Sequence, residues 1–478
     1  MQSGFSFYNA PPIPPALQID GFWVILRQAS NSNNEKTLEY LMKLRTPPPC
    51  FNKLFSALFI ACLAMPVNAD SWPQAEVGAE AAGFTTEGIE RLDAAMREIV
   101  ANQDVAGMVW MLGKDGQIAT YEAAGLASVD DKSPMSKDSL FRIFSMSKPV
   151  TGVAMMMLWE QGLWDFDDPI SKHVPEFANL KVLASYDNNG NVELEDLERQ
   201  PTMRELMSNT AGFAYGLFGN DPANQAFREQ EVLASSDLNE LIQKVAAIPL
   251  MAQPGEQWYY SIGMDIQGYI VEQLTGMSFG EYLRQHLFEP LDMMDTRFYV
   301  LPEDVDRFAQ VHYWDAERNT LAQQAERPDR PSYLDADRLE SGGGGLVSST
   351  HDYARFIQML VNNGELDGVR ILKPESVRIM STNSLTGDED MRYGIGGPGQ
   401  PGQGWGVDLA VLFDPQAAGS PQGPGTYYWA GAAGTSFWID PVNDIFWLSM
   451  IQAQGPRRPG AANMGDVARD IIYESLQD

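Results

Sequence analysis

Residues 140–151 read Leu140-Phe141-Arg142-Ile143-Phe144-Ser145-Met146-Ser147-Lys148-Pro149-Val150-Thr151. An apolar, strand-like run changes here into a helix-like run. Ser145 and Lys148 are three positions apart, so in a helix that begins at the serine their side chains share one face. The pattern predicts a nucleophilic hydroxyl with a cation beside it. No other lysine follows a serine at this spacing, although a capping serine before a surface lysine would look the same.

The chain has 478 residues with 64 acidic and 33 basic side chains, which gives a net charge of -31. Such an excess of negative charge repels phosphate backbones and anionic lipid, so we expect no nucleic-acid or membrane-surface binding. The apolar content of 44% is typical of a globular protein with a substantial core. The length suits two or three domains, or one enzyme body with an inserted lobe.

Residues 51–69 have the features of a secretory signal peptide. A basic flank precedes an apolar core, and the segment ends on Val67-Asn68-Ala69. We expect cleavage before Asp70 and a periplasmic or secreted product, and the core is too short for a stable membrane anchor. A signal peptide stands at the start of its chain, so Met42 is a second candidate start codon. In that case residues 1–41 would not be translated.

The sequence offers little for metal or cofactor binding. Both cysteines, Cys50 and Cys62, fall in or before the signal, so the mature chain is expected to lack thiols and disulfides. The four glycines at 342–345 lack the lysine of a phosphate-binding loop, and they predict a close approach of the backbone to another group. The histidines are scattered, which argues against a zinc site and a Ser-His-Asp triad; they are His173, His286, His312 and His351.

Patterns along the mature chain predict strands at both ends and short helices between them. Residues 70–165 and 335–478 are expected to form an α/β body, and residues 166–334 a mostly helical lobe inserted into it. The turn Lys114-Asp115-Gly116 predicts a hairpin. Expected helices cover residues 89–99, 150–163, 352–362 and 466–476, and expected strands cover 106–113, 117–125, 406–413, 426–429, 436–439 and 445–452.

A second serine competes with Ser145. Gly276-Met277-Ser278-Phe279-Gly280 matches the Gly-x-Ser-x-Gly pentapeptide of α/β-hydrolases, which requires a strand before the serine and a helix after it. Here the preceding residues, 264–274, have a helical pattern, and Ser278 with Glu281 has the form of a capping box. We therefore predict that Ser278 is a helix cap.

Two further segments carry chemistry of interest. Tyr260 lies in the aromatic cluster 255–263. Beside an ammonium the pKa of its phenol would fall, and it could then take a proton from a serine, although such a tyrosine is more often part of a core. The small residues after Trp429 leave the backbone uncovered, so an N–H there can face a substrate oxygen. Tight packing of sheet against helix would explain them equally well.

In this order the segments resemble the serine β-lactamase and penicillin-binding-protein superfamily, in particular its class C-like branch and the family VIII carboxylesterases. The similarity extends from about Gly83 to the C-terminus. It is carried by residues 141–151, 202–213, 289–296, 340–346 and 429–438. The resemblance implies an α/β fold of the α+β type, like that of β-lactamases and DD-peptidases, in which an antiparallel sheet is flanked by helices. The site would lie in a cleft between this body and the helical lobe.

The same resemblance implies roles for individual residues. Ser145 would be the acylated nucleophile, with Lys148 as its electrostatic partner or base. Tyr260 would carry the proton from the serine to the leaving alkoxide. Backbone N–H groups of Ser145 and Ala432 would form the oxyanion hole. Acylation would be followed by deacylation with water.

Two departures change the expected substrate. Ile262 stands where β-lactamases carry asparagine, and Trp429-Ala430-Gly431 stands where they carry Lys-Thr-Gly. The second change removes a cation and a hydroxyl that would hold a substrate carboxylate. We therefore expect Trp429, Gly431 and Ile262 to contact a small-molecule ester, with weak or absent turnover of β-lactams. A class C-like β-lactamase, a D-amino-acid peptidase, an acyltransferase and a non-catalytic penicillin-binding-like recognition module remain alternatives.

Overall fold

The computed structural model describes residues 18–19, 22–23, 71–73, 75–187, 191–325, 331–385, 394 and 399–477. The chain divides into two units, Met1–Asn68 and Ala69–Asp478. In the first unit, β1 (Gln18–Ile19) and β2 (Phe22–Trp23) form an antiparallel pair. The predicted signal peptide at 51–69 lies outside the described residues. Within the described ranges, no helix is long and apolar enough to cross a membrane.

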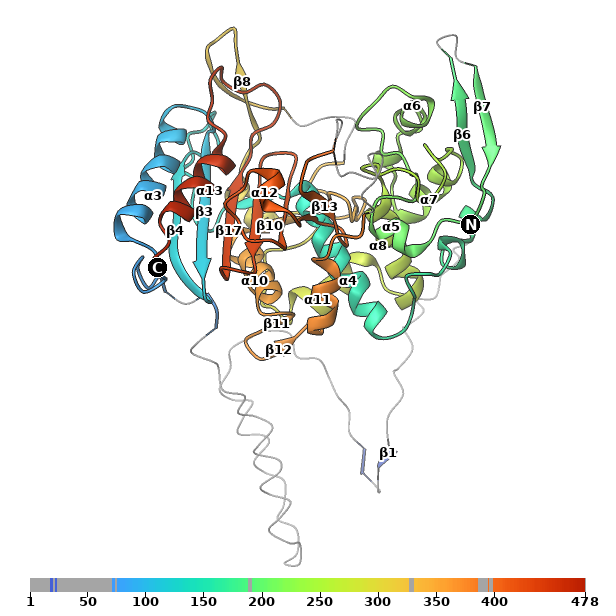
Figure 1. Ribbon diagram of the computed structural model, residues 1–478, viewed down its shortest axis with the longest axis horizontal. Coiled ribbons are helices and arrows are strands. Elements are labelled where there is room, and N and C mark those ends of the chain that lie inside the picture. The colour runs from blue at the N-terminus through green and yellow to red at the C-terminus, as the bar shows by residue number, and fades with distance from the viewer. Residues whose placement is uncertain are drawn as a thin grey trace, which may run out of the picture. The chain divides into compact units, whose positions relative to one another are not determined.

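A seven-stranded antiparallel sheet with the order β13-β14-β15-β16-β17-β3-β4 forms the centre of the second unit (Figure 1). Its strands are β3 (Gly107–Lys114), β4 (Gln117–Gly125), β13 (Gln403–Trp405), β14 (Ala410–Leu412), β15 (Thr426–Ala430), β16 (Ser436–Asp440) and β17 (Ile445–Ile451). Early and late segments of this unit meet where β17 pairs with β3 along its whole length. The predicted antiparallel sheet and the β3–β4 hairpin are confirmed. The hairpin turns at Asp115 and Gly116, which both have positive φ.

One predicted strand, 406–413, is only partly confirmed: Ala410–Leu412 form β14, but the residues before them form a turn. The chain turns between β13 and β14: the Gly406 N–H donates to the Leu409 carbonyl over 2.9 Å, and Asp408 has a φ of 59°. A Cβ at Gly406 would lie 1.9 Å from the Met380 carbonyl oxygen. Buried apolar residues on both sides of this turn gave the sequence a continuous strand-like pattern.

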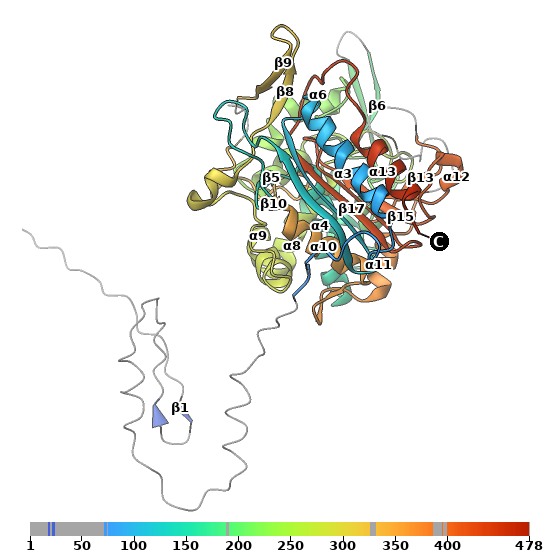
Figure 2. The ribbon, with the colours of Figure 1, turned by 90° about the vertical axis from the view of Figure 1, so that its left-hand side faces the viewer.

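Helices cover both faces of the sheet. On one face α3 (Thr86–Ala101) and α13 (Met464–Glu474) lie side by side across β3, β4 and β17 (Figure 2). Thr85 caps α3 by accepting a hydrogen bond from the Gly88 N–H. The opposite face packs against α10 (Thr350–Val361), and α4 (Ser147–Glu160), which is buried on nearly all sides, lies in the same core.

The region predicted as a mostly helical lobe contains α5 (Met203–Met207), α6 (Pro222–Glu229), α7 (Leu238–Ala246), α8 (Gly263–Thr275) and α9 (Phe279–Leu283). It also contains two hairpins that the sequence patterns did not predict, β6 (Lys181–Tyr186) with β7 (Val192–Asp196) and β8 (His312–Asp315) with β9 (Thr320–Gln323). The remaining strands and α-helices are β5 (Leu140–Arg142), β10 (Val347–Ser349), β11 (Glu365–Leu366), β12 (Val369–Arg370), α11 (Pro374–Met380) and α12 (Pro415–Ala418). The strands β5 and β10 pair with each other.

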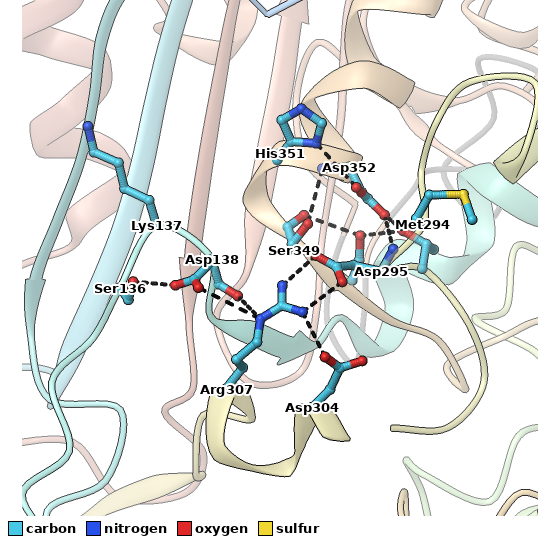
Figure 3. Close-up of polar contacts among 12 residues, drawn as sticks. Ser136, Lys137, Asp138, Met294, Asp295, Asp304, Arg307, Ser349, His351 and Asp352 are labelled. Atoms are coloured by element: carbon cyan, nitrogen blue, oxygen red, sulfur yellow. Dashed lines mark hydrogen bonds and ion pairs between the residues drawn. The ribbon is translucent and has the colours of Figure 1, made fainter. Parts of the chain in front are cut away.

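Segment 289–296 has a structural role. Arg307 donates to both carboxylate oxygens of Asp295, and its Nε donates to the carbonyl of Asp138 over 2.9 Å (Figure 3). Asp352, in the first turn of α10, accepts the Asp295 N–H over 2.7 Å. These bonds join the segment to the residues before β5 and to α10.

Candidate active site

Ser145 lies on a 3₁₀ turn, η2 (Phe144–Met146), between β5 and α4. The residue before it, Phe144, has a φ of 43°, a left-handed conformation that is strained for a bulky side chain. The Ile143 N–H donates to the Leu346 carbonyl over 3.1 Å, which holds the start of this turn. Ser145 is half-buried, and it lines a cavity.

Lys148, in the first turn of α4, is fully buried beneath Ser145. Its ammonium nitrogen lies 2.5 Å from the Gly343 carbonyl oxygen, 3.3 Å from Ser145 Oγ and 3.4 Å from the Tyr215 hydroxyl. It also lies 4.6 Å from the ring centroid of Tyr260. The predicted proximity of Ser145 and Lys148 is confirmed, and two aromatic rings complete the surroundings of the ammonium.

The pKa shifts follow mainly from burial. Desolvation lowers the pKa of Lys148 to about 7, against an opposing influence of the buried carboxylates Asp265 and Asp408. The predicted fall in the pKa of Tyr260 is wrong. Desolvation raises the pKa of this phenol and outweighs the hydrogen bonds with Ser145 and Trp429, which lower it. The prediction counted the neighbouring ammonium and left out the cost of burying a phenolate.

Tyr260 approaches Ser145 from an aromatic cluster. Its hydroxyl donates to Ser145 Oγ over 2.7 Å. Its ring centroid lies 5.5 Å from that of Tyr215, 5.7 Å from that of Trp429 and 6.3 Å from that of Trp258. The rings fix the phenol, so that Ser145 Oγ faces the Tyr260 hydroxyl and the Lys148 ammonium.

The glycine run 342–345 supports this arrangement from the other side of Lys148. A Cβ at Gly342 would lie 2.3 Å from the Met264 carbonyl oxygen, and one at Gly343 would lie 2.5 Å from Asp265 Oδ2. The predicted close approach of the backbone is therefore confirmed. The close approach brings the Gly343 carbonyl to the buried ammonium.

A cavity of about 280 Å³ opens beside Ser145. Ser145 and Ala432 both line it. A Cβ at Gly431 would lie 2.4 Å from the Ile143 carbonyl oxygen, so the chain after β15 lies directly against the turn that carries the serine.

Three predicted substrate contacts are not on the cavity wall. The side chains of Ile262 and Trp429 are 0% and 4% exposed, and both belong to the apolar core. Gly431 is also absent from the lining residues. Trp429 packs against the Tyr260 ring, with 5.7 Å between the ring centroids, so its place is behind the tyrosine.

The sequence patterns missed Tyr215, Ser341 and Asp265. Tyr215 lies two residues after segment 202–213, which carries part of the family resemblance. This closeness was the one feature of the sequence that could have pointed to Tyr215. Ser341 donates to Asp265 Oδ1 over 2.5 Å. No local pattern distinguishes this aspartate, which lies on the buried face of α8.

Ser278 is an exposed helix cap, as predicted. It follows α8 instead of a strand, and its hydroxyl accepts the Glu281 N–H over 3.3 Å. The Glu281 carboxylate pairs with Arg284, so only one half of the predicted capping box forms. None of the four histidines is among the described residues that line the cavity.

The family model described as Beta-lactamase matches residues 92–469. The chain belongs to the β-lactamase family. Protein Rv1367c of Mycobacterium tuberculosis is 34% identical over 75% of this chain and 88% of its own length. Esterase EstB of Burkholderia gladioli is 28% identical over 72% and 85%. The solved structure of EstCE1, a hydrolase with promiscuous acyltransferase activity, superposes with a TM-score of 0.68 at 25% identity, covering 81% of this chain and 98% of that one. This β-lactamase-family chain is thus an enzyme of the serine hydrolases that share the fold.

Proposed function

We propose that this protein is a serine carboxylesterase that forms an acyl-enzyme on Ser145. The observation that carries the proposal is the position of Ser145 Oγ, 2.7 Å from the Tyr260 hydroxyl and 3.3 Å from the Lys148 nitrogen at the edge of a cavity. A nucleophile within hydrogen-bond reach of a base, which is itself held by a third group, is the arrangement that acyl transfer requires.

Acylation would use Lys148 as the base. With a pKa near 7, a large share of its amine is neutral at neutral pH and can take the Ser145 proton while Oγ attacks the ester carbonyl. The oxyanion would accept hydrogen bonds from the N–H groups of Ser145 and Ala432. The Ala432 N–H has no other partner in the described part of the chain.

Tyr260, whose phenol stays protonated, would donate its proton to the leaving alkoxide, and the Lys148 ammonium would restore that proton. Water would then attack the acyl-enzyme and give one proton to Lys148 and Tyr260. These residues would return a proton to Ser145 Oγ as the carboxylic acid leaves.

Two features favour an ester over a β-lactam. The position of the β-lactamase Lys-Thr-Gly motif carries Trp429-Ala430-Gly431, and the Trp429 side chain is buried behind Tyr260. No cation stands at this position. Two of the similar proteins, the esterase EstB and the hydrolase EstCE1, agree with the proposed chemistry.

The test is hydrolysis of p-nitrophenyl butyrate by the wild type, Ser145→Ala and Ser278→Ala. We expect kcat to fall by at least about 10³-fold in Ser145→Ala and to stay unchanged in Ser278→Ala. Unchanged activity in Ser145→Ala would contradict the proposal. A cephalosporin hydrolysed faster than the ester would replace it with a β-lactamase.

We also propose export, on the strength of the leader at 51–69. Amino-terminal sequencing of the protein from the periplasm or the medium should give Asp70. A product that stays in the cytoplasm and keeps its leader would contradict this.

A further inference from the structure

The wall of the cavity is cationic in a protein of net charge -31. Two arginines, Arg142 and Arg338, line the cavity beside Ser145, and none of the described lining residues is acidic. The acidic surface of the protein repels anionic ligands. A pair of guanidinium groups in the cavity would favour the binding of an anionic ligand there.

Tyr333 holds these two cations together. The guanidinium carbon of Arg338 lies 3.7 Å from the centroid of the Tyr333 ring, and that of Arg142 lies 5.3 Å from it. Both distances start from the same ring centroid, so the two guanidinium carbons can be at most 9.0 Å apart. Two like charges held this close are stabilised by an anion that contacts one or both.

Arg338 keeps hydrogen-bonding capacity that the protein does not use. One amino group, Nη1, donates to the carbonyls of Phe298 and Gly345. The other amino group has no partner among the described residues, and the buried Nε also has none. No carboxylate in the described part of the chain pairs with this arginine. A planar guanidinium with free donors matches a carboxylate.

The glycine run joins Arg338 to the catalytic centre. Successive carbonyls of the run accept hydrogen bonds from Lys148 at Gly343, from Tyr333 at Gly344 and from Arg338 at Gly345. Gly343 and Gly345 are two positions apart, and even a fully extended chain covers at most about 7 Å over two residues. The carbonyls that anchor the ammonium and the guanidinium are therefore close neighbours on one turn, and both cations belong to the same site.

We propose that the cavity binds esters that carry a carboxylate, and that Arg338 is the residue that recognises it, with Arg142 adding positive charge. This inference rests on the proposed esterase function and names its substrate class. The reacting ester carbonyl lies at Ser145, and the free carboxylate of the same molecule lies against the Arg338 guanidinium.

The test compares mono-p-nitrophenyl adipate with p-nitrophenyl hexanoate, which have acyl chains of equal length and differ in the terminal carboxylate. A second pair, 4-carboxyphenyl butyrate and its methyl ester, places the carboxylate on the leaving group. We expect the wild type to prefer the anionic member of at least one pair. In Arg338→Gln the ratio of kcat/KM for the anionic over the neutral ester should fall about 10- to 100-fold, and the neutral ester reports any general loss of activity.

Arg338→Lys keeps the charge and should retain part of the preference. Arg378→Gln is the matched control, because Arg378 is exposed on α11, pairs with Glu375 and lowers the net charge equally when replaced. It should change the ratio by less than about twofold. An equal preference in the wild type and Arg338→Gln would overturn the inference.

If no ester is hydrolysed, the proposed function fails, and calorimetric titration with adipate and hexanoate tests the carboxylate subsite alone. Adipate binding that is lost in Arg338→Gln supports it, and equally weak binding of both acids overturns it.

Discussion

The ionisation of Lys148 makes a quantitative prediction for the pH dependence of acylation. With the pKa lowered by burial to about 7, the neutral fraction of the amine rises from about 9% at about pH 6 to about 91% at about pH 8. If the neutral amine is the base, kcat/KM for p-nitrophenyl butyrate rises about tenfold over this interval and then levels off.

An ordinary lysine, or Tyr260 with its raised pKa, would still be almost fully protonated at pH 8. With either as the base, kcat/KM would rise about 100-fold over the same two pH units without a bend. The assay follows p-nitrophenol release at a wavelength where the phenol and the phenolate absorb equally. A profile with no bend between about pH 6 and 8 would refute the assignment of Lys148.

Replacing Asp265 tests whether the bend belongs to Lys148. The negative charge of this buried carboxylate favours the ammonium, so Asp265→Asn should lower the pKa of Lys148 further and move the bend to lower pH. A bend that stays in place would belong to another group.

Three further substitutions test the supports of the site. Gly343→Ala would place a Cβ 2.5 Å from Asp265 Oδ2 and move the carbonyl that binds the lysine, so kcat/KM should fall at least tenfold. Gly344→Ala is its control, because its Cβ would have no neighbour within 3.7 Å; equal losses in both variants would contradict this reasoning. Trp429→Phe shrinks the ring that packs against Tyr260 at a centroid distance of 5.7 Å and should loosen the phenol, so kcat should fall about 2- to 10-fold, with KM nearly unchanged. Arg307→Met breaks a half-buried ion pair and should lower the melting temperature by a few degrees, measured by calorimetry, with KM unaffected.

Local patterns predicted the parts of the fold that depend on neighbouring residues. The hairpin at Asp115 and Gly116, the cap at Ser278 and the apolar helix after Ser145 each follow from a few consecutive residues. The strand predicted at 406–413 began too early, because the buried turn before β14 has the same apolar composition as a strand.

The candidate site was predicted in part. Ser145 and Lys148 were found because one helical turn brings them together. The carbonyl that binds Lys148 is 195 residues away in sequence, and Tyr215 is 67 residues away, so no local pattern reports them. The direction of the Tyr260 pKa shift depends on its burial, which only the packed structure gives. The burial of Trp429 behind that tyrosine could not be predicted for the same reason.

The most direct test of the central claim is the position of the covalent intermediate. The wild type, Ser145→Ala and Ser278→Ala are incubated with a fluorophosphonate, digested and analysed by mass spectrometry. We predict a single adduct on the peptide that contains Ser145, present in Ser278→Ala and absent from Ser145→Ala. An adduct on Ser278, or labelling that persists in Ser145→Ala, would contradict the account.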